Sequence, residues 1–201
     1  RGPPMGWPYR PYRSSEAVDF LLAIASVAVA YLLNFNNPIA GILLPTTAVA
    51  IAIVPHELAH RQIARRRGCW SRFALYRPGF LVTLLVNGLV GIFARGPVLF
   101  ISGYTLISCY SYTREDDGLI SLAGPATNMA VALLSLALLS LPVELGPLTV
   151  QFLIYLMRLN SFVAFFNLLP LGPLDGAKIF RWNIPIWAVM FLAAIYLSFI
   201  I

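Results

Sequence analysis

Long apolar runs, broken by short clusters of charged and turn-forming residues, dominate the chain. A bilayer core about 30 Å thick is crossed by roughly 20 apolar residues in a helix. Five runs approach this length, and charged or turn-forming residues bound them: 17–35, 38–67, 118–141, 148–169 and 184–201. We therefore predict an all-α polytopic membrane bundle of five to six transmembrane helices.

Residues 72–111 are also apolar, but proline, glycine and asparagine interrupt them too often for a full helix. The stretches F-L-V-T-L-L-V (80–86) and V-L-F-I-S (98–102) are rich in β-branched and aromatic residues and have the length of strands. We predict a short β-hairpin or small sheet over 72–105 at membrane depth. Such backbone survives there only if it is buried in protein or lines a wet cavity, which hints at a functional cleft.

Composition agrees with a membrane protein of one domain. Hydrophobic residues make up 59% and charged residues 11% of the 201 residues, against about 25% charged in soluble domains, and the mean hydropathy is +0.80. No linker or repeat divides the chain, so we expect a single domain over 1–201. The net charge of +6 comes from arginines interspersed with apolar spans, and we expect no nucleic-acid partner. Cys69 and Cys109 follow no disulfide or metal motif and are expected to be free.

The basic residues lie at alternate ends of the predicted spans. They precede the first span, separate the second from the third, and follow the fourth (Arg1, Arg10 and Arg13; Arg61 to Arg114; Lys178 and Arg181). The opposite loops, 34–38 and 141–147, carry none. By the positive-inside rule we predict a multi-pass protein of the cell membrane whose N-terminus and active site lie toward the cytoplasm. Arg158 does not fit this pattern, because it falls inside the fourth predicted span. Two explanations stay open: Arg158 faces a polar interior, or the boundary of the fourth span is misplaced.

Both histidines of the chain fall in H-E-L-A-H at 56–60, within the second span. Residues four apart share one helix face, so His56 and His60 can bind the same tetrahedral Zn²⁺. Glu57 is then placed to take a proton from a water molecule as general base. The alternative is a pair of core histidines with Glu57 paired to Arg61. A carboxylate inside a span is costly and usually functional, which favours zinc.

A catalytic zinc needs a third protein ligand and keeps one position for water. Asp175 lies in N-L-L-P-L-G-P-L-D-G at 167–176, where three turn formers release the chain from helix and can return a carboxylate toward the second span. An ordinary Asp-Gly turn or helix cap is the alternative. The acidic residues at 115–117 are expected in a solvated turn, and Glu144 lies on the wrong side of the membrane.

These stretches together resemble the site-2 protease family, which combines H-E-x-x-H in one transmembrane helix with N-x-x-P-x-x-x-L-D-G in a later one. The resemblance implies that His56, His60 and Asp175 bind one Zn²⁺ per chain. It also implies Glu57 as the base and hydrolysis of peptide bonds within or near a substrate's transmembrane segment. Asn167 would support the site through hydrogen bonds.

The stretch S-L-A-G-P-A-T-N at 121–128 also resembles the family, whose G-P-x-x-N opens the helix between the two motifs. For Asn128 two roles stay open: support of the substrate or oxyanion, and a buried bond between helices. The family has an insert like 72–105 near its active site. An exposed strand edge there can hold an unwound substrate by β-addition. The expected partners are single-span membrane proteins and the bilayer, and the oligomeric state stays open.

Other interpretations also remain open. A membrane metal transporter would spread its ligands over several helices, whereas a noncatalytic zinc-binding scaffold would have no use for Glu57. Two histidines and a carboxylate also suit Fe(II). The chain starts at Arg1 and its fifth span ends abruptly at Ile201, and whether it is truncated or lacks a further helix or soluble module stays open.

Overall fold

The computed structural model describes residues 14–32, 37–93 and 98–201. In chain order they form α1 (Glu16–Ala28), the 3₁₀ turn η1 (Val29–Tyr31), the π-helical turn η2 (Ile39–Leu43), α2 (Leu44–Arg66), β1 (Trp70–Leu75), α3 (Arg77–Phe93), β2 (Gly103–Ser108), α4 (Arg114–Leu139), α5 (Pro147–Asn167), α6 (Asp175–Trp182) and α7 (Ile184–Phe199). A predominantly helical chain with a small sheet is therefore confirmed.

Three helices of the described chain are long and apolar enough to cross a membrane: Ile39–Arg66, α4 and α5. They overlap the predicted second, third and fourth spans. The predicted first and fifth spans contain shorter helices, α1 with 13 residues and α7 with 16. The predicted end of the first span, at 35, lies outside the described residues.

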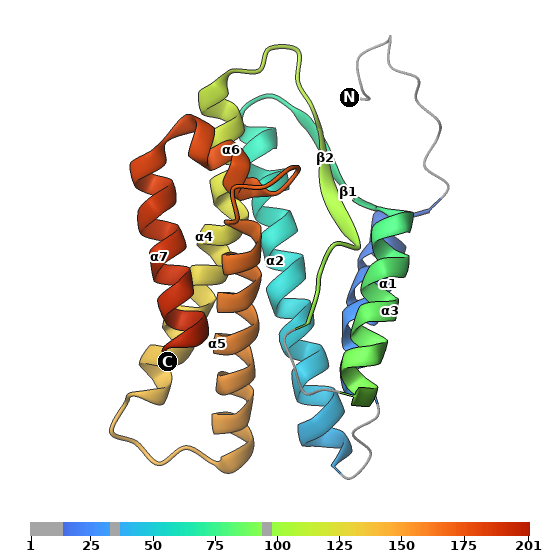
Figure 1. The fold of residues 1–201 in the computed structure, drawn as a ribbon, viewed down its shortest axis with the longest axis vertical. Coiled ribbons are helices and arrows are strands. Elements are labelled where there is room, and N and C mark those ends of the chain that lie inside the picture. Colours follow the sequence, from blue (N-terminus) through green and yellow to red (C-terminus); the bar gives the residue numbers. More distant parts are fainter. Residues whose placement is uncertain (1–13, 33–36, 94–97) are drawn as a thin grey trace.

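Helix α2 stands at the centre of the bundle (Figure 1). It packs against α4 and α5 on one side, and α7 lies against α5. On its other side α1 and α3 pack together, with β1 against α1. The motif helix α2 therefore has neighbours on opposite faces.

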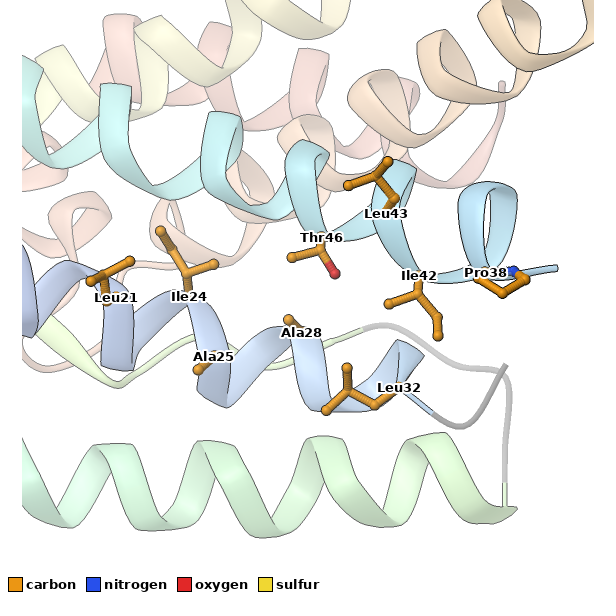
Figure 2. Close-up of a pocket in the computed structure, with 9 residues that line it drawn as sticks. All are labelled: Leu21, Ile24, Ala25, Ala28, Leu32, Pro38, Ile42, Leu43 and Thr46. Carbon is orange, nitrogen blue, oxygen red and sulfur yellow. The ribbon is translucent and has the colours of Figure 1, made fainter. Parts of the chain in front are cut away.

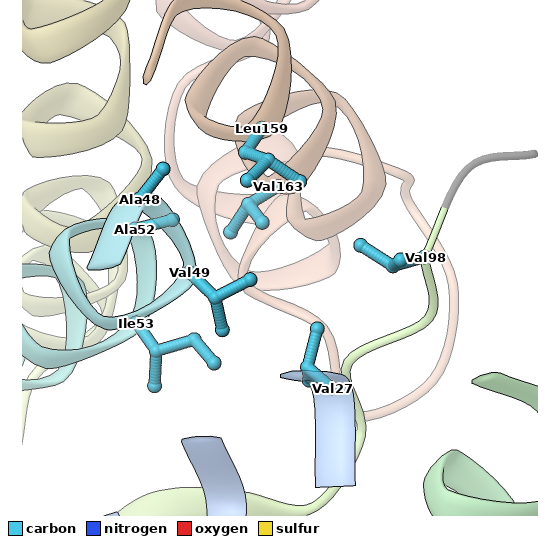
Figure 3. Close-up of a cluster of buried hydrophobic side chains, with 8 residues drawn as sticks. All are labelled: Val27, Ala48, Val49, Ala52, Ile53, Val98, Leu159 and Val163. Atoms are coloured by element: carbon cyan, nitrogen blue, oxygen red, sulfur yellow. The ribbon is translucent and has the colours of Figure 1, made fainter. Parts of the chain in front are cut away.

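Two apolar clusters hold these layers. The first joins α1, α2 and α5 with the segment before β2, and Figure 3 shows its side chains: Val27, Ala48, Val49, Ala52, Ile53, Val98, Leu159 and Val163. The second joins α4, α5, α6 and α7 (Met129, Ala132, Ala164, Leu168, Ile179, Ala194 and Leu197). Because α5 belongs to both clusters, it fixes α2 relative to α6, and these two helices carry the candidate ligands.

The prediction that no full helix fits within 72–111 is wrong. Helix α3 runs for 17 residues and includes the stretch F-L-V-T-L-L-V that is predicted as a strand. The glycines of α3 do not form turns. They let the helix pack closely against neighbouring backbone. A Cβ added at Gly79 would collide with the carbonyl of Ile101, and one at Gly91 would lie 2.8 Å from the carbonyl oxygen of Ala30. Small residues at such contacts let backbones approach closely in membranes.

The stretch V-L-F-I-S is extended but has no strand partner. Side chains of α3 take the place of one: the Asn87 amide accepts from the Leu99 N–H at 2.8 Å and donates to the Leu99 carbonyl at 2.8 Å. The hydroxyl of Thr83 accepts from the Ile101 N–H at 3.2 Å. In an apolar medium these bonds satisfy backbone groups that water cannot reach.

The sheet is a single antiparallel pair, with a register from Trp70↔Ser108 to Leu75↔Gly103. It is not the predicted hairpin, because α3 lies between its strands. One position beyond the first ladder pair, Cys69 and Cys109 form a disulfide, so the prediction of free cysteines is wrong. Their separation of 40 residues carries no motif, and only the strand register brings them together.

The expectation about Arg158 fails. Arg158 lies inside α5 on its exposed surface, so it neither faces a polar interior nor marks a helix boundary. The acidic residues at 115–117 lie at the surface as predicted, but they belong to the first turn of α4 rather than to a loop. There Thr113 and Asp116 form a capping box, which satisfies free N–H groups at the helix start.

Candidate metal centre

The three predicted ligands converge at one point. Helix α2 presents His56 and His60 one turn apart, and the start of α6 brings Asp175 to them. The Nε2 atoms of the histidines are 3.0 Å apart. Oδ2 of Asp175 lies 3.0 Å from Nε2 of His60 and 3.4 Å from Nε2 of His56. Both histidines are buried, at 2% and 6% exposure. Within the described ranges, this is the group of ligand side chains that could hold a metal ion.

The size of this triangle fits zinc. Bonds of about 2.0–2.1 Å at tetrahedral angles separate two ligand atoms by about 3.3 Å. The three observed separations, 3.0, 3.0 and 3.4 Å, lie close to that value. Two imidazoles and a carboxylate are also a common ligand set for a catalytic zinc. The residues present therefore fit the metal that the sequence predicts.

Hydrogen bonds to the far ring nitrogens fix the histidine tautomers. Nδ1 of His60 lies 2.7 Å from the Ile120 carbonyl oxygen, which can only accept, so this Nδ1 carries the proton. Nδ1 of His56 donates to the Asn128 side-chain oxygen at 2.5 Å. Both Nε2 atoms then turn lone pairs toward the Asp175 carboxylate. A cluster made only of acceptors needs a cation at its centre, which a metal ion supplies.

A second amide holds Asn128 in place. The Asn128 NH₂ group donates to the Ala52 carbonyl and to the Asn160 side-chain oxygen, both at 2.8 Å. Both amide hydrogens are thus used, and Asn128 links α4 to α2 and α5. Asn160 belongs to neither motif and was not predicted as a site residue. The signal in the sequence is an asparagine inside the apolar run 148–169, where polar side chains commonly join helices. Support of a substrate by Asn128 stays a prediction.

Gly124 brings the backbone of α4 directly against the two histidines. A Cβ added there would collide with Nε2 of His60 and would lie 2.6 Å from Nε2 of His56. The G-P-x-x-N stretch therefore contributes twice to the metal centre. Its glycine leaves space at the ligand atoms, and its asparagine orients one of the rings.

The proposed base, Glu57, is buried at 5% exposure and does not pair with Arg61. Arg61 instead makes a two-pronged ion pair with Glu16, at 2.8 Å to each oxygen. Oε2 of Glu57 accepts a hydrogen bond from the hydroxyl of Thr105 in β2 at 2.8 Å. The carboxylate is therefore held by the sheet, and the alternative pairing with Arg61 is absent.

Glu16 ties β1 to the helices beside it. Its Oε1 accepts from the Phe73 N–H at 2.9 Å as well as from Arg61. Partial burial alone would raise the pKa of Glu16, but these hydrogen bonds and the charge of Arg61 hold it below its usual range. The ionised carboxylate thus links α1, α2 and β1 at the end of the bundle that carries the ligands.

The loop after α5 places Asp175. Gly172 has φ +47°, a backbone conformation that favours glycine, and it reverses the chain before α6. Gly176 packs against the Leu168 carbonyl so closely that a Cβ would collide with it. Asp175 is the first residue of α6, so this close packing brings its carboxylate to the two histidines.

Asn167, at the end of α5, donates to the Val163 carbonyl at 3.0 Å. Within the described part of the chain it makes no hydrogen bond to His56, His60 or Asp175. Its support of the site stays a prediction.

An apolar groove of about 430 Å³ opens between α1 and the start of α2 (Figure 2). Leu21, Ile24 and Ile42 are among its lining residues, and none of the ligands or Glu57 takes part. This groove is separate from the metal centre, and its walls suit lipid chains better than polar chemistry.

Two buried histidines on a helix long and apolar enough to cross a membrane, a glutamate beside the first of them and a carboxylate from α6 form a candidate metal centre of the kind that zinc metalloproteases use. The chain is 33% identical over 182 residues to "Putative zinc metalloprotease MJ0611" of Methanocaldococcus jannaschii, covering 89% of this chain and 91% of that protein. The chain belongs to the site-2 protease family of zinc metalloproteases.

A second relative matches over a shorter region. "Putative zinc metalloprotease Rip3" of Mycobacterium tuberculosis is 29% identical over 132 residues, which are 65% of this chain and 28% of that protein. No protein-family profile matches the chain, and no solved structure matches it either.

Proposed function

We propose that the protein is an intramembrane zinc metalloprotease that hydrolyses peptide bonds within or near the transmembrane segments of other membrane proteins. The observation that carries this proposal is the convergence of His56, His60 and Asp175, with Glu57 one residue after the first ligand. A structural zinc site would be closed by four protein ligands, whereas three leave a position for water. The kinship with zinc metalloproteases supports the same conclusion.

His56, His60 and Asp175 would hold the ion. When bound, zinc supplies Lewis acidity that polarises a carbonyl and activates a water molecule. Glu57 accepts the proton of that water and later delivers it to the leaving amine. The Asn128 side-chain oxygen and the Ile120 carbonyl oxygen keep the histidine rings oriented throughout, because each accepts a hydrogen bond from an Nδ1–H group.

A transmembrane helix must unwind locally before its peptide bonds can be attacked, and we propose that β2 receives the unwound segment. The Phe73 N–H points away from β2 to Glu16, so Phe73↔Thr105 is a pair without ladder hydrogen bonds. The N–H and C=O of Thr105 then face the outer edge of β2. In the described ranges, no backbone group of β2 bonds outside the ladder. This edge can accept an extended chain by β-addition.

We propose single-span membrane proteins as substrates, one Zn²⁺ per chain as the metal, and an active site that opens toward the cytoplasm. The orientation rests on the distribution of arginine and lysine. The Cys69–Cys109 disulfide lies beside the sheet, at the end of the bundle that we place toward the cytoplasm. Disulfides persist mainly in oxidising compartments, so the Cys69–Cys109 bond counts against this orientation.

The test is cleavage of a single-span substrate reconstituted with the full chain in liposomes. We expect mass spectrometry to place the cut within or next to the apolar span. A chelator should stop the reaction, and added zinc should restore it. Zinc carried across the liposome membrane without any cleavage would support the transporter instead. Zinc bound tightly with neither cleavage nor transport would support the scaffold.

A further inference from the structure

The carboxylate of Glu57 contacts the sheet through a single hydroxyl. Thr105 Oγ1 lies 2.8 Å from Glu57 Oε2 and 3.1 Å from the Glu57 backbone carbonyl. One hydroxyl hydrogen can therefore serve both acceptors. In the described residues Oε1 of Glu57 has no hydrogen-bond partner. The two oxygens thus differ, because one is held and the other is free.

Thr105 is itself held firmly. It lies opposite Phe73 in the ladder, and Phe73 is fully buried and stacks on Phe20 with ring centroids 4.1 Å apart. The Glu16 carboxylate anchors the Phe73 N–H, and the disulfide closes the far end of the strand pair. The hydroxyl is therefore fixed relative to α2 by the sheet rather than by a flexible loop.

We infer that Thr105 is a positioning residue for the base, holding Oε2 of Glu57 so that Oε1 is directed to the reacting water. This inference rests on the proposed protease function. It adds a residue outside both sequence motifs, on the strand that we propose as the substrate's docking edge. The same residue then faces the substrate with its backbone and the base with its side chain. Docking and base position are thereby linked through one residue.

The contact between the Thr105 hydroxyl and Glu57 is tested first, without any cleavage assay. The test is a double-mutant cycle on thermal unfolding of the zinc-free full chain. Thr105→Val keeps the shape of the side chain and its β-branching but removes the hydroxyl. It should lower the unfolding midpoint by about 2–4 °C. In a Glu57→Ala background the same change should have a smaller effect, because only the 3.1 Å bond to the backbone carbonyl of residue 57 is then lost. Thr47→Val, which removes an exposed α2 hydroxyl bonded to the Leu43 carbonyl, should shift both backgrounds equally.

Cleavage of the single-span substrate then tests the role in catalysis. Thr105→Val should reduce kcat by roughly 10- to 100-fold, because a displaced catalytic group loses most of its effect. KM and bound zinc should remain as in the native chain. Thr105→Ser restores the hydroxyl and should recover most of kcat.

The inference is overturned if the Thr105→Val shift is the same with and without Glu57. It is also overturned if Thr105→Ser loses as much kcat as Thr105→Val, or if Thr105→Val loses its zinc. A native chain that cleaves nothing would refute the proposed function, whereas the unfolding cycle would still report on the contact between Thr105 and Glu57.

Discussion

At the scale of single residues, the metal centre depends on groups that are not ligands. The Nδ1 atoms of both histidines donate to oxygens, from Asn128 and from Ile120, and this leaves Nε2 free for the metal. Gly124 leaves the space in which the two Nε2 atoms meet Asp175. The ligand spacing could be predicted from H-E-L-A-H alone, because residues four apart always share a helix face. Asn128 could be predicted as a candidate for a buried bond between helices, but its pairing with His56 and the role of the Ile120 carbonyl could not, since both come from another helix.

Gly124→Ala provides a test at this scale. Alanine normally stabilises a helix interior relative to glycine, by about 1 kcal/mol. Here its Cβ would collide with the ligand nitrogens, so we expect the zinc content of the purified variant to fall to near zero. Gly88→Ala in α3 is the matched control, because a Cβ there meets no atom within 4 Å. Native zinc content in the Gly124→Ala chain would show that the helices can separate and that this packing is not essential.

At the scale of elements, buried backbone N–H and C=O groups find hydrogen-bond partners that local sequence patterns do not reveal. The sequence predicts strands at 80–86 and 98–102, yet the first lies in helix α3 and the second is an extended segment bonded to the side chains of that helix. Glycine and asparagine indicate turns in a soluble protein. Here Gly79 and Gly91 serve helix packing, and Asn87 replaces a neighbouring strand. The prediction failed because tertiary contacts override local propensity at these positions.

Asn87→Leu should therefore destabilise the fold although it makes α3 more apolar. The fully buried Asn87 amide makes three hydrogen bonds, two to Leu99 and one to the Ser26 carbonyl. Leaving buried backbone groups unpaired costs about 1–3 kcal/mol each. We expect the free energy of unfolding in detergent to fall by about 3 kcal/mol or more. Leu85→Ala, on the exposed face of α3, should change it little. Equal stabilities for both variants would contradict this account of the extended segment.

The disulfide is the second prediction at this scale. Cys69 and Cys109 close the end of the ladder that leads to Thr105. Replacing both with serine should reduce the free energy of unfolding by about 2–4 kcal/mol. A reducing agent should have the same effect on the native chain and none on the double variant. If the reducing agent leaves the native chain unchanged while thiol labelling finds two free cysteines, the bond is absent from the protein.

At the scale of the whole molecule, the apolar clusters and the loop after α5 bring two distant motifs to one point. His56 and Asp175 are far apart in sequence, and α5 connects their helices by packing in both clusters. The family, the candidate membrane spans and the candidate ligands could be predicted from composition and motifs. The contacts of Asn160 and Thr105 are visible only in the packed structure. The small sheet beside the centre gives the molecule both a strand edge and a contact to the base.

Zinc content and cleavage measured on the same preparations of native, Glu57→Gln and Asp175→Ala chains test the central claim most directly. Glu57 is proposed to move protons and Asp175 to bind metal. The Glu57→Gln chain should therefore retain one zinc and lose cleavage, by roughly 100-fold or more, whereas Asp175→Ala should lose both. A Glu57→Gln chain that still cleaves at the native rate, or an Asp175→Ala chain that keeps its zinc and its activity, would contradict the assignment of this centre as the protease site.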